Sequence, residues 1–184
     1  MQSASIVSLL LTALASCSTA SSGASSGTTA PHGLARYEER RVAMGVQARI
    51  VLYADSRERA DDAFTGAFAR IERLESALSD WRPASELSRL CDGAGGPPRE
   101  VSADLYGAIE RSLALARSSA GAFDPAIGPL VAVWRKARAD GRVPEKAAID
   151  AALPLSRWEK IELDPAHRTV RLAQAGMRLD LGAI

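Results

Sequence analysis

Apolar side chains recur every three or four positions between residues 60 and 78, which is the spacing of an amphipathic helix with one buried face. Asp55 and Glu58 stand three residues apart just before this stretch, and such a capping-box pattern predicts that Asp55 begins the helix. The periodic pattern stops at Ser79. We therefore expect one long helix that starts after Asp55 and ends at Ser79.

Pro83 follows this helix and excludes a direct continuation, because proline lacks an amide donor and disfavours helical geometry in the residue before it. Ser85 is a suitable N-cap for a short helix that ends near Leu90. We expect residues 91–100 to form a surface loop. The glycines of this loop lack the spacing of a phosphate-binding turn, and no strand leads directly into them.

A second periodic stretch predicts a helix over residues 102–118 with Ser102 as its cap. Four apolar residues of this stretch are expected to face inward: Leu105, Ile109, Leu113 and Ala116. Pro129 suits the first position of a further helix that reaches Ala139 and is closed by Gly141, and Pro144 suits the start of another that reaches Leu153.

Both ends of the folded part have the pattern of strands. Residues 37–44 and 47–53 predict a hairpin around Gly45. Near the other end we expect three short antiparallel strands, at residues 160–163, 169–172 and 177–181. Strands, then helices, then strands again indicate an α+β fold rather than alternating βαβ units.

Length and charge limit the possible functions. A chain of 184 residues is long enough for one domain with a real core. Its 23 Lys and Arg against 22 Asp and Glu give a net charge of +1, so no basic field exists that would attract nucleic acid. Nucleic acid is therefore not an expected partner. The chain has two cysteines, and Cys91 has no partner if Cys17 is lipidated as expected below, so we expect no disulfide. No paired-cysteine spacing is present, which makes a zinc site unexpected.

The first thirty residues differ from the rest. Their apolar run is shorter than the ~20 residues that span a bilayer but has the length of a signal-peptide core. We expect residues 1–16 to be a signal peptide, although its first residues lack Lys and Arg. Leu-Ala-Ser-Cys at its end resembles a bacterial lipobox, in which Cys17 is lipidated; a simple secretory leader is the alternative. Residues 17–35 would then be a flexible Ser/Gly/Thr tether to the cell envelope, and the domain at 36–184 would face the periplasm or the outer side of the inner membrane.

Three segments have local sequences that suit neither a regular helix nor a regular strand. They are Met44-Gly45, LSDWRPASELSRL at residues 78–90 and SSAGAFDPAIGPL at residues 118–130. Such conflicts often mark functional sites. Each has an ordinary alternative, since the third segment could be a helix end and a turn with Phe123 as a core residue.

In order, these segments resemble the ApbE family, periplasmic flavin transferases that move FMN from FAD onto a threonine of a target protein. Met44-Gly45 is similar to the family's Met-Gly-Thr, residues 78–90 to its Leu-Ser-aromatic segment with Ser-Glu, and GAFDPAIGPL with Trp134 to its Gly-Ala-Phe-Asp signature. LDLGAI at residues 179–184 is similar to the start of its Asp-Leu-Gly motif. The resemblance implies an ApbE-like (T-fold-like) mixed sheet with packed helices.

The resemblance also implies a set of FAD contacts: Met44, Trp81, Ala122, Phe123, Asp124 and Asp180. Met44 and Trp81 would lie against the flavin or adenine, where a thioether and a wide aromatic face suit a π-system. Ala183 would offer its carbonyl to Mg²⁺. The alternatives are that Trp81 only packs on the surface, that Met44 is ordinary core and that Asp180 is a solvent-facing strand residue.

The implied reaction is Mg²⁺-dependent transfer of FMN from FAD to a threonine of an acceptor protein, a membrane redox-complex subunit, with release of AMP. Two alternatives stay open: an FAD pyrophosphatase that gives FMN and AMP, and an FAD-binding lipoprotein without catalysis. We assign no catalytic residue. His32 falls in the tether and His167 in a turn, so neither is expected to act as a base.

The chain departs from the family pattern in three respects. Val46 replaces the Thr of Met-Gly-Thr, and Cys91 stands where the family commonly has Asn. The sequence stops at Ile184, before the family's Lys-Gly and the Asp and Thr that complete its magnesium site. We therefore expect the fold to be incomplete and the chain to be an inactive N-terminal portion of the enzyme, with unpaired strand edges.

Overall fold

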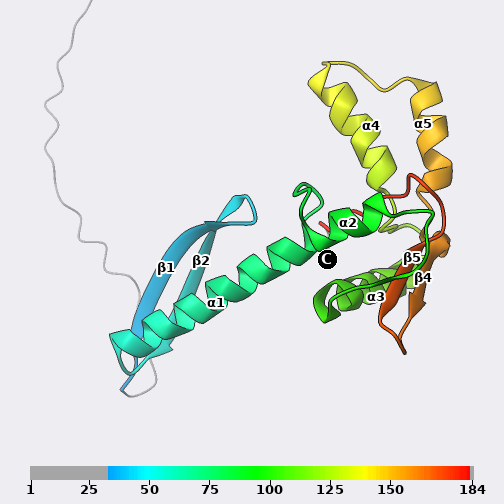
Figure 1. Ribbon diagram of the computed structural model, residues 1–184. Coiled ribbons are helices and arrows are strands. Elements are labelled where there is room, and N and C mark those ends of the chain that lie inside the picture. Colours follow the sequence, from blue (N-terminus) through cyan, green and yellow to red (C-terminus); the bar gives the residue numbers. More distant parts are fainter. Residues whose placement is uncertain (1–32, 183–184) are drawn as a thin grey trace, which may run out of the picture.

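The computed structural model describes residues 33–182, which form an arm and a body (Figure 1). The arm is a two-stranded sheet packed along one long helix, and the body holds the remaining helices and a three-stranded sheet. In chain order the elements are β1 (Ala35–Ala43), β2 (Val46–Ala54), α1 (Arg57–Leu78), α2 (Glu86–Asp92), β3 (Arg99–Glu100), α3 (Ala103–Ser118), α4 (Gly128–Ala139), α5 (Lys146–Ala152), two 3₁₀ turns (Leu153–Leu155 and Trp158–Lys160), β4 (Ile161–Asp164) and β5 (Thr169–Leu172).

The arm confirms the predicted hairpin and long helix. β1 and β2 pair antiparallel from Ala35 opposite Ala54 to Ala43 opposite Val46. Alternate residues of β2 turn towards α1 and pack on its apolar stripe, as the strand period requires. The core of the arm contains Ala60, Phe64 and Phe68 of α1, with Tyr37, Ala48, Ile50, Leu52, Ala54 and Ile71 around them.

The predicted cap of α1 was wrong by one residue. Ser56 is the N-cap, and its side chain accepts a hydrogen bond from the Arg59 N–H at 3.3 Å. The Asp55 carboxylate instead forms an ion pair with the Arg59 side chain at 3.0 Å. Both residues suit a cap, and only the backbone direction at the end of β2 decides between them.

The body is built around α3, as the periodic pattern predicted. Ser102 caps this helix by accepting from the Leu105 N–H at 3.2 Å. All four residues expected to face inward are buried. The sheet has the order β3-β5-β4, with both pairs antiparallel, and covers the body core together with α2. That core contains Leu87, Leu90, Cys91, Val101, Leu105, Ala108, Ile109, Leu113, Ala126, Ile161, Val170, Leu172, Met177, Leu179 and Leu181.

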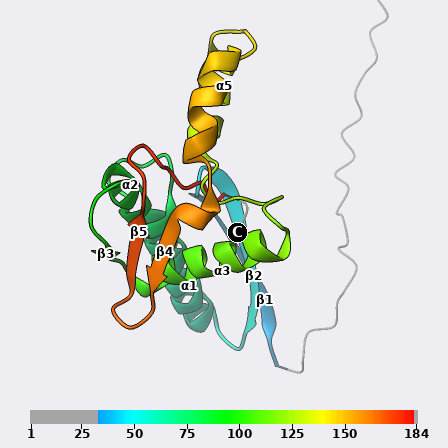
Figure 2. The ribbon, with the colours of Figure 1, turned by 90° about the vertical axis from the view of Figure 1, so that its right-hand side faces the viewer.

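Helices α4 and α5 project together from the body (Figure 1), and Figure 2 shows α5 standing clear of the body sheet. α4 begins at Gly128, so Pro129 is its second residue rather than its first. α5 begins at Lys146, after Glu145 as N-cap, two residues later than Pro144 suggested. Both proline positions still lie in the first turn or just before it, where the missing N–H costs no helical hydrogen bond.

Two further predictions were wrong. Residues 177–181 are not a strand, because their N–H groups bond to a thiol and a loop carbonyl instead of a neighbouring strand: Leu179 donates to Cys91 Sγ at 3.3 Å and Asp180 to the Pro125 oxygen at 2.9 Å. Residues 91–100 are not only a loop, since they contain the last turn of α2 and all of β3. β3 is the third strand of the sheet.

The α+β class is confirmed, with each sheet paired to helices. Over residues 33–182 no helix has the length and apolar character needed to cross a bilayer. The predicted signal peptide, Cys17, His32 and Ala183 lie outside the described residues.

Candidate functional site

The GAFDP loop begins at a tightly wound end of α3. Ala120 and Gly121 both have left-handed backbones, with φ of 50° and 81°. The Gly121 N–H donates to the Ala116 carbonyl at 2.9 Å and the Ala120 N–H to the Arg117 carbonyl at 3.1 Å, which together form a Schellman cap. Ala120 thus holds the left-handed position that ends the helix, and Gly121 follows with a second positive φ, which glycine adopts without strain, and turns the chain into the loop.

Asp124 holds the loop in shape. Its Oδ1 accepts from the Ala126 N–H at 2.8 Å and its Oδ2 from the Trp158 N–H at 3.1 Å. Phe123 is half-buried, and Ala122 before it is exposed. A Cβ at Gly121 would lie 3.4 Å from Trp158 Nε1, so the space in front of this glycine is filled by the protein's own indole.

The last described segment lies against the same loop. A Cβ at Gly128 would come within 2.7 Å of the Arg178 carbonyl oxygen, so only glycine allows this approach. The Asp180 N–H donates to the Pro125 oxygen at 2.9 Å. These two contacts join the GAFDP loop to the segment that carries Asp180.

An arginine of α4 links this segment to the loop before α2. Both Nη atoms of Arg135 lie 3.0 Å from Asp80 Oδ2, and Nη2 lies 3.8 Å from Asp180 Oδ2. Asp80 directly precedes Trp81, whose side chain is 55% exposed. The tryptophan therefore stands at the surface beside an ion-pair cluster.

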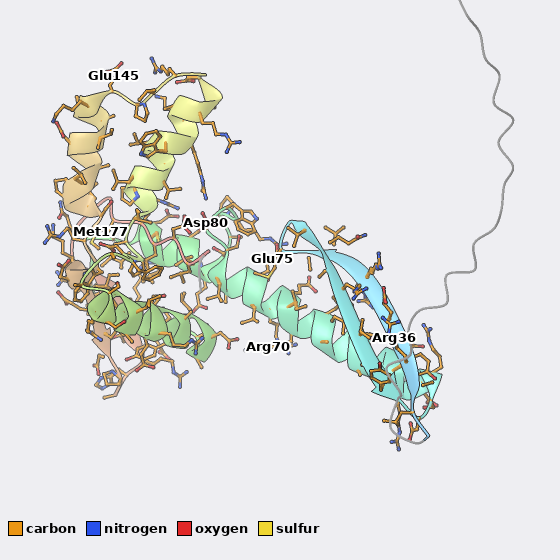
Figure 3. All side chains as sticks on the ribbon, turned by 180° about the vertical axis from the view of Figure 1, so that it is seen from behind. Arg36, Arg70, Glu75, Asp80, Glu145 and Met177 are labelled. Atoms are coloured by element: carbon orange, nitrogen blue, oxygen red, sulfur yellow. The ribbon has the colours of Figure 1, made fainter. Side chains whose placement is uncertain are left out.

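The tip of the β1–β2 hairpin is held to α1 by a buried carboxylate. Glu75 is 7% exposed; its Oε2 accepts from the Met44 N–H at 3.3 Å, and its Oε1 lies 2.9 Å from Arg82 Nη2. Met44 has a left-handed backbone, with φ of 53°. Figure 3 shows Glu75 on α1 beside the hairpin tip and Asp80 between that tip and the start of α4.

A continuous chain of contacts thus joins all the predicted FAD-binding segments. It runs from Met44 through Glu75 to Arg82, along the backbone to Asp80, and through Arg135 to Asp180 and the GAFDP loop. Met44 is 47% exposed, so it is not an ordinary core residue. A hollow of about 360 Å³ lies beside it, lined in part by Ala43, Glu75 and Arg82. The predicted contacts with FAD stay predictions.

The described residues do not form a metal site by themselves. Between residues 33 and 182, no three His, Cys, Asp or Glu side chains gather closely enough to hold an ion. Asp180 offers one carboxylate, but its Oδ1 accepts from the Gly182 N–H at 3.0 Å and its Oδ2 faces Arg135. Magnesium does not fit this donor set, since it prefers several oxygen ligands in octahedral geometry.

Cys91 and His167, which both lie outside the cluster, have shifted pKa values. Burial raises the pKa of the Cys91 thiol, which lies beneath Leu179. The Asp164 carboxylate raises the pKa of His167 through a 2.7 Å contact in the exposed turn between β4 and β5. His167 therefore belongs to a surface turn.

The sequence did not identify Glu75, Gly128 or Arg135 as parts of this arrangement. Glu75 gave a local signal that could have been used, because it is a charged residue on the buried stripe of α1. Gly128 lies in the marked segment at residues 118–130, but nothing in the sequence indicated its contact with Arg178, and Arg135 gave no signal. Their partners, Arg178 and Asp80, are distant in sequence, and only the fold brings them together.

Curated proteins of known activity are similar to this chain. The chain is 36% identical over 155 residues to a FAD:protein FMN transferase of Treponema pallidum, covering 80% of the chain and 42% of that protein. It is 36% identical over 149 residues to the protein of the same name from Klebsiella pneumoniae, covering 80% and 46%. The chain thus spans less than half the length of these curated relatives.

Solved structures share the fold. The ApbE protein of Thermotoga maritima has a TM-score of 0.70 at 25% identity over 80% of this chain and 48% of its own. The flavin transferase ApbE of Vibrio cholerae has a TM-score of 0.71 at 22% identity over 82% and 49%. The sequence model of the ApbE family matches residues 44–184, which include the hairpin tip and every motif joined by the contacts above. The chain belongs to the ApbE family.

Proposed function

We propose that residues 36–184 form the N-terminal part of a flavin transferase domain, which transfers FMN from FAD to a threonine of an acceptor protein. The observation that carries this proposal is the contact chain from Met44 to the GAFDP loop, in a member of the ApbE family. Relatives named FAD:protein FMN transferase support the same activity.

The proposed reaction is a displacement at phosphorus. The threonine oxygen forms a bond to the phosphorus of the FMN half of FAD, and the bond from this phosphorus to the bridging oxygen breaks. AMP leaves with that oxygen, and the threonine proton passes to solvent or to a base. We assign no base to the described residues.

The residues of this chain would act by binding and orienting FAD. Trp81 presents an exposed aromatic face and Met44 an exposed thioether, and both suit a flat ring system. Ala122 and half-buried Phe123 would line the loop side of the cofactor. Asp124 would act mainly through the loop, because backbone N–H groups already occupy both of its oxygens.

The magnesium requirement is part of the proposal but rests only on the family resemblance. Ala183, the residue expected to ligate the ion, lies outside the described residues. We derive no step through the metal. Its removal by a chelator is expected to abolish transfer.

We also propose that Cys17 is lipidated and holds the protein on the cell envelope, facing the periplasm or the outer side of the inner membrane, near a membrane redox-complex subunit as acceptor. The lipobox-like LASC sequence supports this location. Cys17→Ser should move the protein from the membrane fraction to the soluble fraction after cell breakage. An unchanged distribution would contradict the anchor.

The test of the activity uses the protein expressed from its full gene. FAD, Mg²⁺ and a candidate acceptor are incubated with it, and covalent flavin on the acceptor and free AMP are measured. Labelled acceptor with AMP supports transfer. AMP without label would replace transferase by pyrophosphatase, and FAD binding with neither product would leave a binding protein.

A further inference from the structure

We propose that Arg135 is a positioning residue for the flavin site, which fixes the Trp81 loop relative to the segment that carries Asp180. This inference rests on the proposed function. Arg135 is not among the residues that the sequence marks for contact with FAD; it belongs to α4 and directly follows Trp134, the last matched residue of the GAFDP signature.

The geometry gives Arg135 two partners in two different segments. Its Nη2 atom lies 3.0 Å from Asp80 Oδ2 and 3.8 Å from Asp180 Oδ2. The side chains of Asp80 and Asp180 are only 16% and 22% exposed, whereas that of Arg135 is 62% exposed. The guanidinium therefore covers two sheltered carboxylates from the solvent side.

Without this guanidinium the two carboxylates would lose the positive charge that both of them share. Nearby like charges repel, and the repulsion is stronger where solvent is partly excluded. The expected response is that the Asp80 loop and the Asp180 segment move apart. An FAD molecule that contacts both segments would then lose its contacts with one of them.

Trp81 depends on this arrangement because both of its neighbours are held by ion pairs. Asp80 is tied to α4 through Arg135, and Arg82 is tied to α1 through Glu75. The bonds within the loop join only Ser79, Arg82 and Ser85 to one another. The Asp80–Arg135 pair is thus the side-chain link that sets Trp81 relative to α4.

The same helix offers a matched control. Arg138 is exposed and forms no ion pair with any residue in the described part of the chain. Replacing it removes the same charge from the same helix without touching Asp80 or Asp180. A general attraction between basic α4 and the FAD diphosphate would weaken equally in both variants.

The experiment measures the Kd for FAD in the protein expressed from its full gene, by quenching of flavin fluorescence with Mg²⁺ present. Arg135→Met should weaken binding about tenfold and Arg138→Met less than about twofold. Arg135→Lys should recover part of the loss, because it keeps the charge without the planar fork. The urea midpoint of unfolding should stay nearly constant, since Arg135 lies largely in solvent.

A double-variant cycle identifies the partner. Asp80→Asn alone should weaken binding, and adding it to Arg135→Met should cause no further loss and should recover part of the affinity, because one of the two repelling carboxylates is removed. Equal Kd values for wild type and Arg135→Met would overturn the inference while leaving the proposed function intact. Equal losses in Arg135→Met and Arg138→Met would also overturn it. A wild-type protein that does not bind FAD would overturn the proposed function and, with it, this inference.

Discussion

The Glu75 carboxylate is the residue on which the hairpin tip depends. It is nearly buried, and it serves both the Met44 N–H and the Arg82 guanidinium. A glutamine in its place could still accept from Met44 but would lose the charge that holds Arg82. The tip and the Trp81 loop would then lose their common attachment to α1.

We predict that Glu75→Gln lowers the free energy of unfolding by about 1–2 kcal/mol, a moderate value because Arg82 is partly in solvent. Urea denaturation followed by circular dichroism measures this loss. The control is Glu72→Gln, an exposed position of the same helix, for which the change should stay within about 0.5 kcal/mol. Equal effects of the two variants would show that the Glu75–Arg82 pair contributes no more to the free energy of unfolding than an exposed charge does.

Cys91 gives a prediction about pH. Burial raises the pKa of its thiol, so the folded state keeps the proton more firmly than the unfolded state. Its contribution to stability is therefore complete below the ordinary cysteine pKa of about 8.5 and is lost as the pH rises towards the raised value.

In a Cys17→Ser chain, where Cys91 is the only thiol, alkylation by iodoacetamide should be slow at pH 8.5 and fast once urea unfolds the protein. Rapid alkylation of the folded chain would contradict the buried position.

At the scale of elements, the start of α4 must lie against the segment before Asp180. Gly128→Ala places a Cβ 2.7 Å from the Arg178 carbonyl oxygen, a backbone atom that cannot move aside cheaply. We expect a loss of about 1–3 kcal/mol in the free energy of unfolding, measured in urea. Weaker FAD binding should accompany it, because the loop and the segment separate.

The matched control is Gly66→Ala in the middle of α1. A Cβ there meets nothing within 4 Å, so the only effect is the gain in helix propensity. This variant should be more stable by about 0.5–1 kcal/mol. A Gly128→Ala protein as stable as wild type would mean that the close approach to Arg178 does not exist in solution.

The sequence predicted elements well where the signal is local. α1 and α3 follow from apolar spacing, and the caps Ser85 and Ser102 follow from side-chain chemistry. The alternation of buried Met177, Leu179 and Leu181 also looks like a strand, but pairing depends on a neighbour that local pattern does not specify. β3 was not predicted, because a strand of two residues is too short to show a periodic pattern.

At the scale of the whole molecule, the candidate site is distributed over the arm and the body. Met44 belongs to the hairpin, Trp81 to the connection after α1, and the GAFDP loop and Asp180 to the body. Family motifs in the sequence indicated which segments take part. They could not indicate what joins the segments, because Arg135 and Asp80 are 55 positions apart and no local pattern in the sequence pairs them.

The most direct test of this account is an equilibrium titration of the protein, expressed from its full gene, with FAD in the presence of Mg²⁺. We predict saturable binding with quenching of both flavin and tryptophan fluorescence, and a clear loss of affinity in Trp81→Ala, because the exposed indole would stack on the cofactor. Absence of saturable binding at millimolar FAD, or equal affinity in Trp81→Ala and wild type, would contradict the assignment of these joined segments as the flavin site.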